Sequence, residues 1–127
     1  MDTETDNGLC TLREAIEAAN SDTASGVAVG ECVAGSGADT INFAITPLNS
    51  TVKTIATTGS LPQFTSAVTI DGTSQSGAQC GTLVPELPAN NNTPHILKIE
   101  IDAGGVALFA SQSTSFTLPV TIKGLAI

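Results

Sequence analysis

Charged side chains that could carry out acid–base chemistry are grouped in two parts of the chain. Lys98, Glu100 and Asp102 alternate along one predicted strand, and Asp71 and Lys123 each follow another. Paired carboxylates, with a lysine base or a calcium ion, are the groups that cleave acidic polysaccharides. Alternate positions of a strand share one face, however, and a charged face is usually a solvated one. We therefore predict no catalytic residue and keep a polysaccharide lyase or hydrolase as an alternative function.

Two further features weigh against an enzyme. His95 is the only histidine, and it follows Pro94 at the end of a loop, where a single histidine is more often incidental than catalytic. The chain has no Trp and no Tyr, which are the side chains that stack best on a sugar ring. The sequence predicts neither an enzyme nor an organic cofactor.

The first residues carry alternating acids, which raises the question of a calcium site. Asp2, Glu4 and Asp6 have the spacing of the first ligands of an EF-hand loop. That loop needs Gly at its sixth position and Glu at its twelfth, whereas Asn7 and Arg13 stand there. We interpret the segment as a solvated acidic lead-in, with a calcium site of another kind as the alternative.

Three cysteines, Cys10, Cys32 and Cys80, have no metal-binding spacing. Cys10 lies just before a predicted helix, and Cys32 lies in a Gly-rich loop that returns past it. A disulfide between them would close a loop of about 20 residues and stabilise the fold by about 3 kcal/mol. The alternative is a pair of reduced thiols in a cytosolic protein. We favour the disulfide, which leaves Cys80 without a partner.

The segment CTLREAIEAAN, residues 10–20, predicts the one clear helix, at about residues 12–20. Thr11 and Glu14 form a capping box, in which each side chain bonds the backbone N–H of the other residue. The apolar positions share one stripe, which consists of Leu12, Ala15, Ile16 and Ala19. A helix this short is not stable alone in water, so the stripe must pack on an apolar surface. Thr11, Leu12, Glu14, Ile16 and Ala19 are the predicted structural residues.

Short β-rich runs separated by Gly, Pro and polar residues make up the rest of the chain. Residues 40–45 alternate, with Ile41, Phe43 and Ile45 on one face. Further strands are predicted at 51–57, 67–70, 95–102, 106–110, 120–122 and 125–127, with a shorter alternation at Phe116 and Leu118.

Two of these strands are near copies, because AVTIDG at 67–72 and PVTIKG at 119–124 share VTI-x-G. Recurrent short strands broken by Gly are typical of a solenoid, whereas a sandwich normally has longer strands and tight hairpins. We therefore predict a mainly β fold: a right-handed parallel β-helix of a few coils with an N-terminal amphipathic capping helix. The predicted division is an N-terminal cap at 1–39, with an acidic lead-in, the helix and a Gly-rich loop, and the first coils at 40–127.

The composition narrows the classes of partner. The net charge is −8, from 12 acidic and four basic residues, and such a surface does not suit nucleic acid. No apolar run approaches the roughly 20 residues of a membrane-spanning helix.

Three segments, CTLREAIEAAN, ECVAGSGADTINF and VTIDGTSQSGA, resemble the N-terminal region of bacterial surface and secreted proteins with a CSLREA-type motif. The resemblance covers residues 6–127 and extends to adhesins like the polymorphic outer-membrane proteins. It implies a parallel β-helix, an extracellular or cell-surface location, and a structural or adhesive role at the N-terminal end of a larger protein. Expected partners are a host or surface glycan or protein, the remaining coils of a longer chain, or a second copy. A self-assembling filament that stacks coil to coil is the further alternative.

Overall fold

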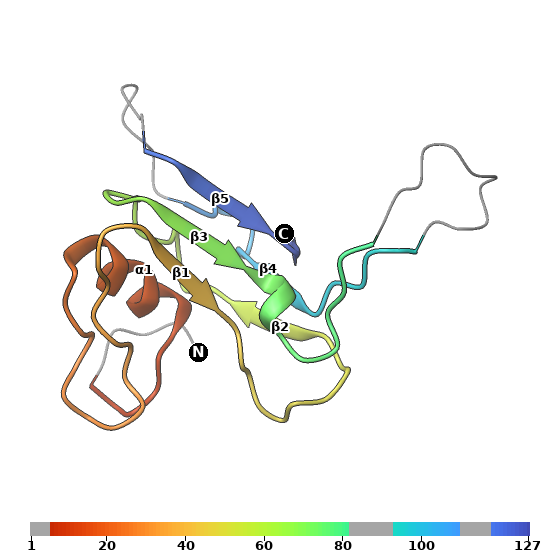
Figure 1. Cartoon of the computed structure of the whole chain (residues 1–127), viewed down its shortest axis with the longest axis horizontal. Helices are drawn as coiled ribbons and strands as arrows, with labels where there is room; N and C mark the ends of the chain where they lie inside the picture. The colour runs from red at the N-terminus through yellow and green to blue at the C-terminus, as the bar shows by residue number, and fades with distance from the viewer. Residues whose placement is uncertain (1–5, 82–92, 110–117) are drawn as a thin grey trace.

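The computed structural model describes residues 6–81, 93–109 and 118–127 of the chain. These residues form one α-helix, α1 (Leu12–Ser21), and one short 3₁₀ helix, η1 (Gly72–Ser74). They also form six short strands: β1 (Asp39–Asn42), β2 (Lys53–Ala56), β3 (Val68–Asp71), β4 (Ile99–Asp102), β5 (Val120–Lys123) and β6 (Leu125–Ala126). The strands alternate along the chain between two sheets, and α1 lies beside β1 (Figure 1).

The predicted helix and its capping box are confirmed. The backbone N–H of Glu14 donates to Thr11 Oγ1 over 3.3 Å, and the N–H of Thr11 donates to Glu14 Oε2 over 2.9 Å. Leu12, Ile16 and Ala19 are buried, so the apolar stripe faces the core as predicted. The helix ends at Ser21 because Asp22 adopts a left-handed conformation.

The two sheets have the strand orders β1-β3-β5 and β2-β4-β6, and every strand pair in them is parallel. The register places Ile41 beside Ile70 and Ile70 beside Ile122 in the first sheet. In the second sheet, Ile55 lies beside Ile101. Because side chains alternate across a strand, each such row of aliphatic side chains lies on one face of its sheet.

One apolar core joins the helix to both sheets. Its buried members come from α1, from three strands (β1 with the residue after it, β3 and β4), and from the segment between β2 and β3: Leu12, Ile16, Ala19, Ile41, Phe43, Leu61, Phe64, Val68, Ile70, Ile99 and Ile101. The rings of Phe64 and Phe109 lie 4.9 Å apart between centroids, which closes the core beside that segment. Aliphatic side chains therefore supply most of this interior, in keeping with the low aromatic content.

The predicted right-handed parallel β-helix is wrong. The described residues form two small three-stranded parallel sheets and one helix, and neither sheet closes or curls into a solenoid. The strands are only two to four residues long, and the segment around Leu61 contributes a single bridge to Phe109 instead of a strand. Recurrent short runs and turns predict parallel pairing, but they do not specify how the paired strands are arranged in space.

The strands predicted at 67–70 and 120–122 match β3 and β5 to within one residue, whereas β2 and β6 are shorter than the predicted 51–57 and 125–127. Strand β1 covers only the first half of 40–45, and β4 covers only the second half of 95–102. No strand forms over 106–109, where Phe109 makes only its bridge to Leu61. Residues 110 and 116, parts of two further predicted strands, lie outside the described residues. Strand β1 begins at Asp39, beside the predicted boundary between 39 and 40, and a separate cap at 1–39 stays a prediction.

Candidate functional site

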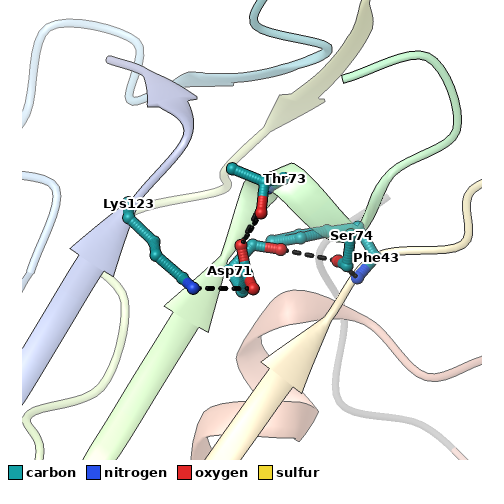
Figure 2. A network of polar contacts seen from close by, with 5 residues as sticks. All are labelled: Phe43, Asp71, Thr73, Ser74 and Lys123. Atoms are coloured by element: carbon teal, nitrogen blue, oxygen red, sulfur yellow. Dashed lines mark hydrogen bonds and ion pairs between the residues drawn. The ribbon is translucent and has the colours of Figure 1, made fainter. Parts of the chain in front are cut away.

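The two VTI-x-G segments lie side by side and bring one acidic and one basic side chain together. Strands β3 and β5 pair in register, so Asp71 lies opposite Lys123. Lys123 Nζ and Asp71 Oδ2 are 3.0 Å apart (Figure 2). Asp71 Oδ1 also accepts bonds from the backbone N–H and the hydroxyl of Thr73. The carboxylate therefore caps η1 on one side and holds β5 on the other.

Ser74 extends this network to β1. Its hydroxyl donates to the carbonyl oxygen of Asp71 over 2.6 Å, and the N–H of Phe43 donates to the same hydroxyl oxygen over 2.7 Å (Figure 2). The carboxyl ends of β1, β3 and β5 are thus joined by polar contacts in addition to the backbone ladder.

Glycine is required after the aspartate and after the lysine because the backbones approach closely there. A Cβ atom on Gly72 would lie 2.1 Å from the carbonyl oxygen of Gly124. Gly124 has a φ of +69° and faces Thr73 at a similarly short distance. The repeated glycine in the two segments therefore allows the two turns to pack against each other.

The environment of Asp71 favours the charged carboxylate. The hydroxyl of Thr73, then Lys123 and the N–H of Thr73, lower the pKa of Asp71 below its ordinary value, and they outweigh the opposing effect of partial burial. A carboxyl group with a lowered pKa is a poor proton donor at neutral pH and a weak base. The contacts of Asp71 therefore suit a structural role, holding β5 and η1 in place, better than acid–base catalysis.

A second polar cluster fastens the beginning of the chain to the Gly-rich loop. Glu31 Oε1 accepts from the backbone N–H of Asn7 and of Gly8 over 2.7 and 2.6 Å. Its other oxygen accepts from the Ser25 hydroxyl over 2.8 Å. Beside it, Cys10 and Cys32 form the predicted disulfide. The bond of Gly8 to the carboxylate, followed by that of Ser25, lowers the pKa of Glu31.

Only one of the three calcium candidates lies in the described part of the chain. Asp2 and Glu4 lie outside it, and Asp6 accepts bonds from the backbone N–H groups of Val27 and Ala28 over 3.4 and 3.0 Å. Over residues 6–81, 93–109 and 118–127, no group of three or more His, Cys, Asp or Glu side chains is arranged to hold a metal ion. In its described contacts, Asp6 holds loop backbone through hydrogen bonds, as Glu31 does.

A shallow hollow of about 320 Å³ lies between α1 and the loop that follows it. Its lining combines carboxylates with hydroxyl groups, from Asp6, Glu14, Glu17, Ser21, Thr23 and Ser25. Glu14 is buried, and its carboxylate belongs to the capping box, while Asp6 holds the loop. These two acids therefore already have partners in the protein.

The other acid–base candidates are separated from Asp71 by the topology, because β4 belongs to the second sheet and β3 to the first. On β4, Glu100 accepts from the hydroxyl of Thr54 over 2.9 Å, and Asp102 accepts from the N–H of Gly104 over 2.9 Å. Lys98 lies just before β4, and its carbonyl oxygen accepts from the N–H of Lys53. The structure therefore does not bring Asp71 together with Glu100 and Asp102.

His95 lies in an exposed segment that pairs with the loop after η1. Its Nδ1 atom accepts from the N–H of Gly81 over 3.0 Å, next to the bridge between Gln79 and Ile96. Cys80, between these two contacts, is a free exposed thiol. The histidine side chain therefore bonds backbone here.

The sequence analysis missed two residues that organise the structure. Gln75 is almost fully buried, and its side-chain amide bonds both the N–H and the carbonyl oxygen of Ile45. Nothing in its Ser-rich surroundings distinguishes it. Glu31 adjoins Cys32, and an acid next to a predicted disulfide in a loop of backbone donors is a signal that could have identified it.

Comparison of the chain with protein-family models, curated proteins and solved structures finds no match. The resemblance to CSLREA-type surface proteins therefore stays a prediction from the residues. Within the described ranges, no helix combines the length and the apolar character needed to cross a bilayer.

Proposed function

We propose that this chain is a structural module of an extracellular or cell-surface protein. The observation that carries the proposal is the Cys10–Cys32 disulfide, with the bonds of Glu31 and Asp6 to backbone around it. Disulfides persist in oxidising compartments and are rare in the cytosol. These cysteine and carboxylate side chains thus hold the backbone in place, which suits a module whose role depends on its shape.

An adhesive role at the N-terminal end of a larger surface protein follows from the sequence resemblance alone. The segment that carries it, CTLREAIEAAN, forms α1 and places Cys10 beside the loop. The ligand would be a glycan or a protein on another surface. Binding of the purified chain to glycan and protein arrays tests this adhesive role.

Location is the experiment that tests the proposal most directly. Antibodies should label the protein on intact source cells or detect it in the medium. Alkylation without reductant, followed by mass spectrometry, should modify Cys80 and leave Cys10 and Cys32 bonded. A protein recovered only from the cytosol, with all three cysteines alkylated, would contradict the proposal.

A polysaccharide-cleaving enzyme remains the alternative from a different class. It predicts release of unsaturated or reducing sugars from acidic polysaccharides, and loss of that activity in Asp71→Ala or Asp102→Ala. These two carboxylates belong to different sheets and bond neighbouring residues, which does not favour a shared active site.

A filament is the other alternative, and it requires complementary surfaces at both ends of the molecule. Among the described strands, β1 lies at one edge of the first sheet, and α1 packs beside it there (Figure 1). Electron microscopy at high protein concentration distinguishes the alternatives, because filaments lengthen with concentration whereas a structural module stays a discrete particle.

A further inference from the structure

The loop between β1 and β2 carries the triplet Asn49-Ser50-Thr51. This triplet has the pattern Asn-x-Ser/Thr with no Pro in the middle, which is the acceptor pattern for attachment of a sugar to an asparagine side chain. Triplets of this kind also occur by chance, so the surroundings of the side chain decide whether this one can accept a sugar. An acceptor needs an exposed position, a hydroxyl group that reaches the amide, and an amide nitrogen that is not already bonded.

The whole triplet is exposed. Asn49, Ser50 and Thr51 all lie at the surface, in a loop outside the strands of the two sheets (Figure 1). The apolar neighbours on either side are exposed as well, since Leu48 is 61% and Val52 is 53% exposed. A sugar on Asn49 would therefore extend into solvent without displacing any part of the core, and it would shield some of this apolar surface.

Contacts with the segment around and after η1 hold the loop in place. The N–H of Ile45 donates to Gln75 Oε1 over 2.8 Å, and Gln75 Nε2 donates to the carbonyl oxygen of Ile45 over 3.1 Å. Gly77 adjoins the loop so closely that a Cβ atom on it would lie 3.2 Å from the Cα atom of Ser50. These contacts involve Ile45 and Ser50, and they leave the side chain of Asn49 accessible.

Three hydrogen-bond donors converge on the amide oxygen of Asn49. The hydroxyl and the N–H of Thr51 donate to Asn49 Oδ1 over 2.6 and 3.2 Å, and Lys53 Nζ donates to it over 2.9 Å. A backbone N–H and an ammonium group can only donate, so the atom that they contact is the oxygen of the amide. None of the described hydrogen bonds of Asn49 uses the amide nitrogen, Nδ2. The hydroxyl of the triplet therefore reaches the amide, and the nitrogen is available.

We propose that Asn49 is glycosylated on its amide nitrogen by a transferase that takes the sugar from a phosphate-linked donor. A bond forms between Nδ2 and the C1 atom of the sugar, while the bond between C1 and the phosphate oxygen breaks. The departing phosphate keeps the electron pair of that bond, and Nδ2 gives up one proton to a base of the transferase. The donors on Oδ1 stabilise the negative charge that develops on the amide as this proton leaves.

This inference rests on the extracellular role proposed above, because the acceptor pattern identifies surface loops of secreted proteins. The Cys10–Cys32 disulfide belongs to the same kind of compartment. A sugar is bulky and solubilising, so it suits an exposed loop beside apolar side chains. Modification of Asn49 would add a specific chemical mark to the structural module.

Mass spectrometry of the mature protein, isolated from its source cells, tests the inference. A second triplet, Asn91-Asn92-Thr93, has the same pattern and lies partly outside the described residues, so the two must be read separately. Trypsin cleaves after Lys53, which places the triplets in different peptides, 14–53 and 54–98. After reduction and alkylation, the peptide 14–53 should be heavier by the mass of a sugar, and electron-transfer fragmentation should place that mass on Asn49.

Variants expressed in the same cells separate the acceptor pattern from other causes. Asn49→Gln and Thr51→Ala should each abolish the added mass on this peptide, whereas Thr51→Ser keeps a hydroxyl group and should retain it. Ser50→Ala is the matched control, because the middle position accepts any residue except Pro, and it should leave the modification unchanged. All of these positions are exposed, and an intact Cys10–Cys32 disulfide in each variant establishes that the chain has folded.

Several results would overturn the inference. They are an unmodified Asn49 in the mature protein, a sugar found only on a hydroxyl group or only on the second triplet, and a modification that survives Thr51→Ala. An extracellular protein with the Cys10–Cys32 disulfide and an unmodified Asn49 would reject the glycosylation alone. A cytosolic protein with all three cysteines reduced and Asn49 unmodified would reject the extracellular role together with it.

Discussion

The same row of aliphatic side chains runs from the β1 edge to the β5 edge of the first sheet, but the two edges have different surroundings. At the β1 end, α1 packs beside the strand, and a disulfide and a carboxylate cluster fasten the adjoining loop. At the β5 end, Ile122 is exposed. Among the described residues, the aliphatic row is therefore buried at the β1 edge and partly exposed at the β5 edge.

Side chains at the β1 edge should contribute more to the stability of the fold than those at the β5 edge. Ile16 on α1 is fully buried, whereas Ile122 on β5 is 39% exposed. Apolar burial is the main source of folding free energy, so equal substitutions at the two ends should have unequal costs. Four measurements test this difference between the two edges, and their expected effects decrease in the order given.

The same truncation at each end should give the largest contrast. Ile16→Ala should lower the free energy of unfolding by about 4 kcal/mol, because it leaves a cavity between α1 and the core. Ile122→Ala should cost less than about 1 kcal/mol, because its side chain is already partly solvated. Denaturant unfolding measures both losses. Similar losses would show that the two ends do not differ.

Removal of the disulfide should come next. Cys10→Ala combined with Cys32→Ala should cost about 3 kcal/mol, because the unfolded chain is no longer constrained by a closed loop. Thermal unfolding monitored by circular dichroism reports the loss. Cys80→Ser, which changes a free exposed cysteine, is the control and should leave the unfolding temperature unchanged. Equal stability of the double variant and the native chain would mean that other contacts hold this end.

The capping box should have a smaller effect. Thr11→Ala removes the oxygen that accepts the N–H of Glu14, and should cost about 1 kcal/mol. Thr65→Ala is a matched control, because Thr65 is exposed and its described bond uses only the backbone N–H. Denaturant unfolding of both variants measures the difference. A cost equal to that of the control would argue that the cap does not stabilise α1.

The smallest effect is the dependence of stability on pH at Glu31. Its pKa is lowered below the ordinary value of 4.5 by bonds from Gly8 and Ser25. The stabilisation is therefore complete above that value and is lost as the pH falls through the lower folded-state pKa. Unfolding measured from about pH 7 to about pH 3 should show a steeper decrease for the native chain than for Glu31→Gln. Parallel curves would contradict the role of the carboxylate.

Local features of this protein were readily predicted from sequence. The capping box of Thr11 and Glu14 and the apolar stripe of α1 depend on residues three or four positions apart, so the local pattern contains the interaction. The disulfide was predicted because one cysteine adjoins the helix and the other lies in the loop that follows it. The positions of the main strands were also predicted: β3 and β5 match to within one residue, while the strands predicted at 40–45, 51–57 and 95–102 were too long.

The arrangement of those strands was not predicted correctly. Two separate parallel sheets and a solenoid share the same short runs and glycine turns, and they differ only in contacts between distant residues. The pairing of Asp71 with Lys123, 52 positions apart, depends on the register of β3 with β5. Gln75 bonds Ile45 across 30 positions for the same kind of reason.

Spacing and residue type were therefore enough to predict the helix, its cap and the apolar rows, and to favour the disulfide between Cys10 and Cys32. The strand register and the position of α1 beside β1 could be seen only in the tertiary structure, because both depend on contacts between residues far apart in the sequence.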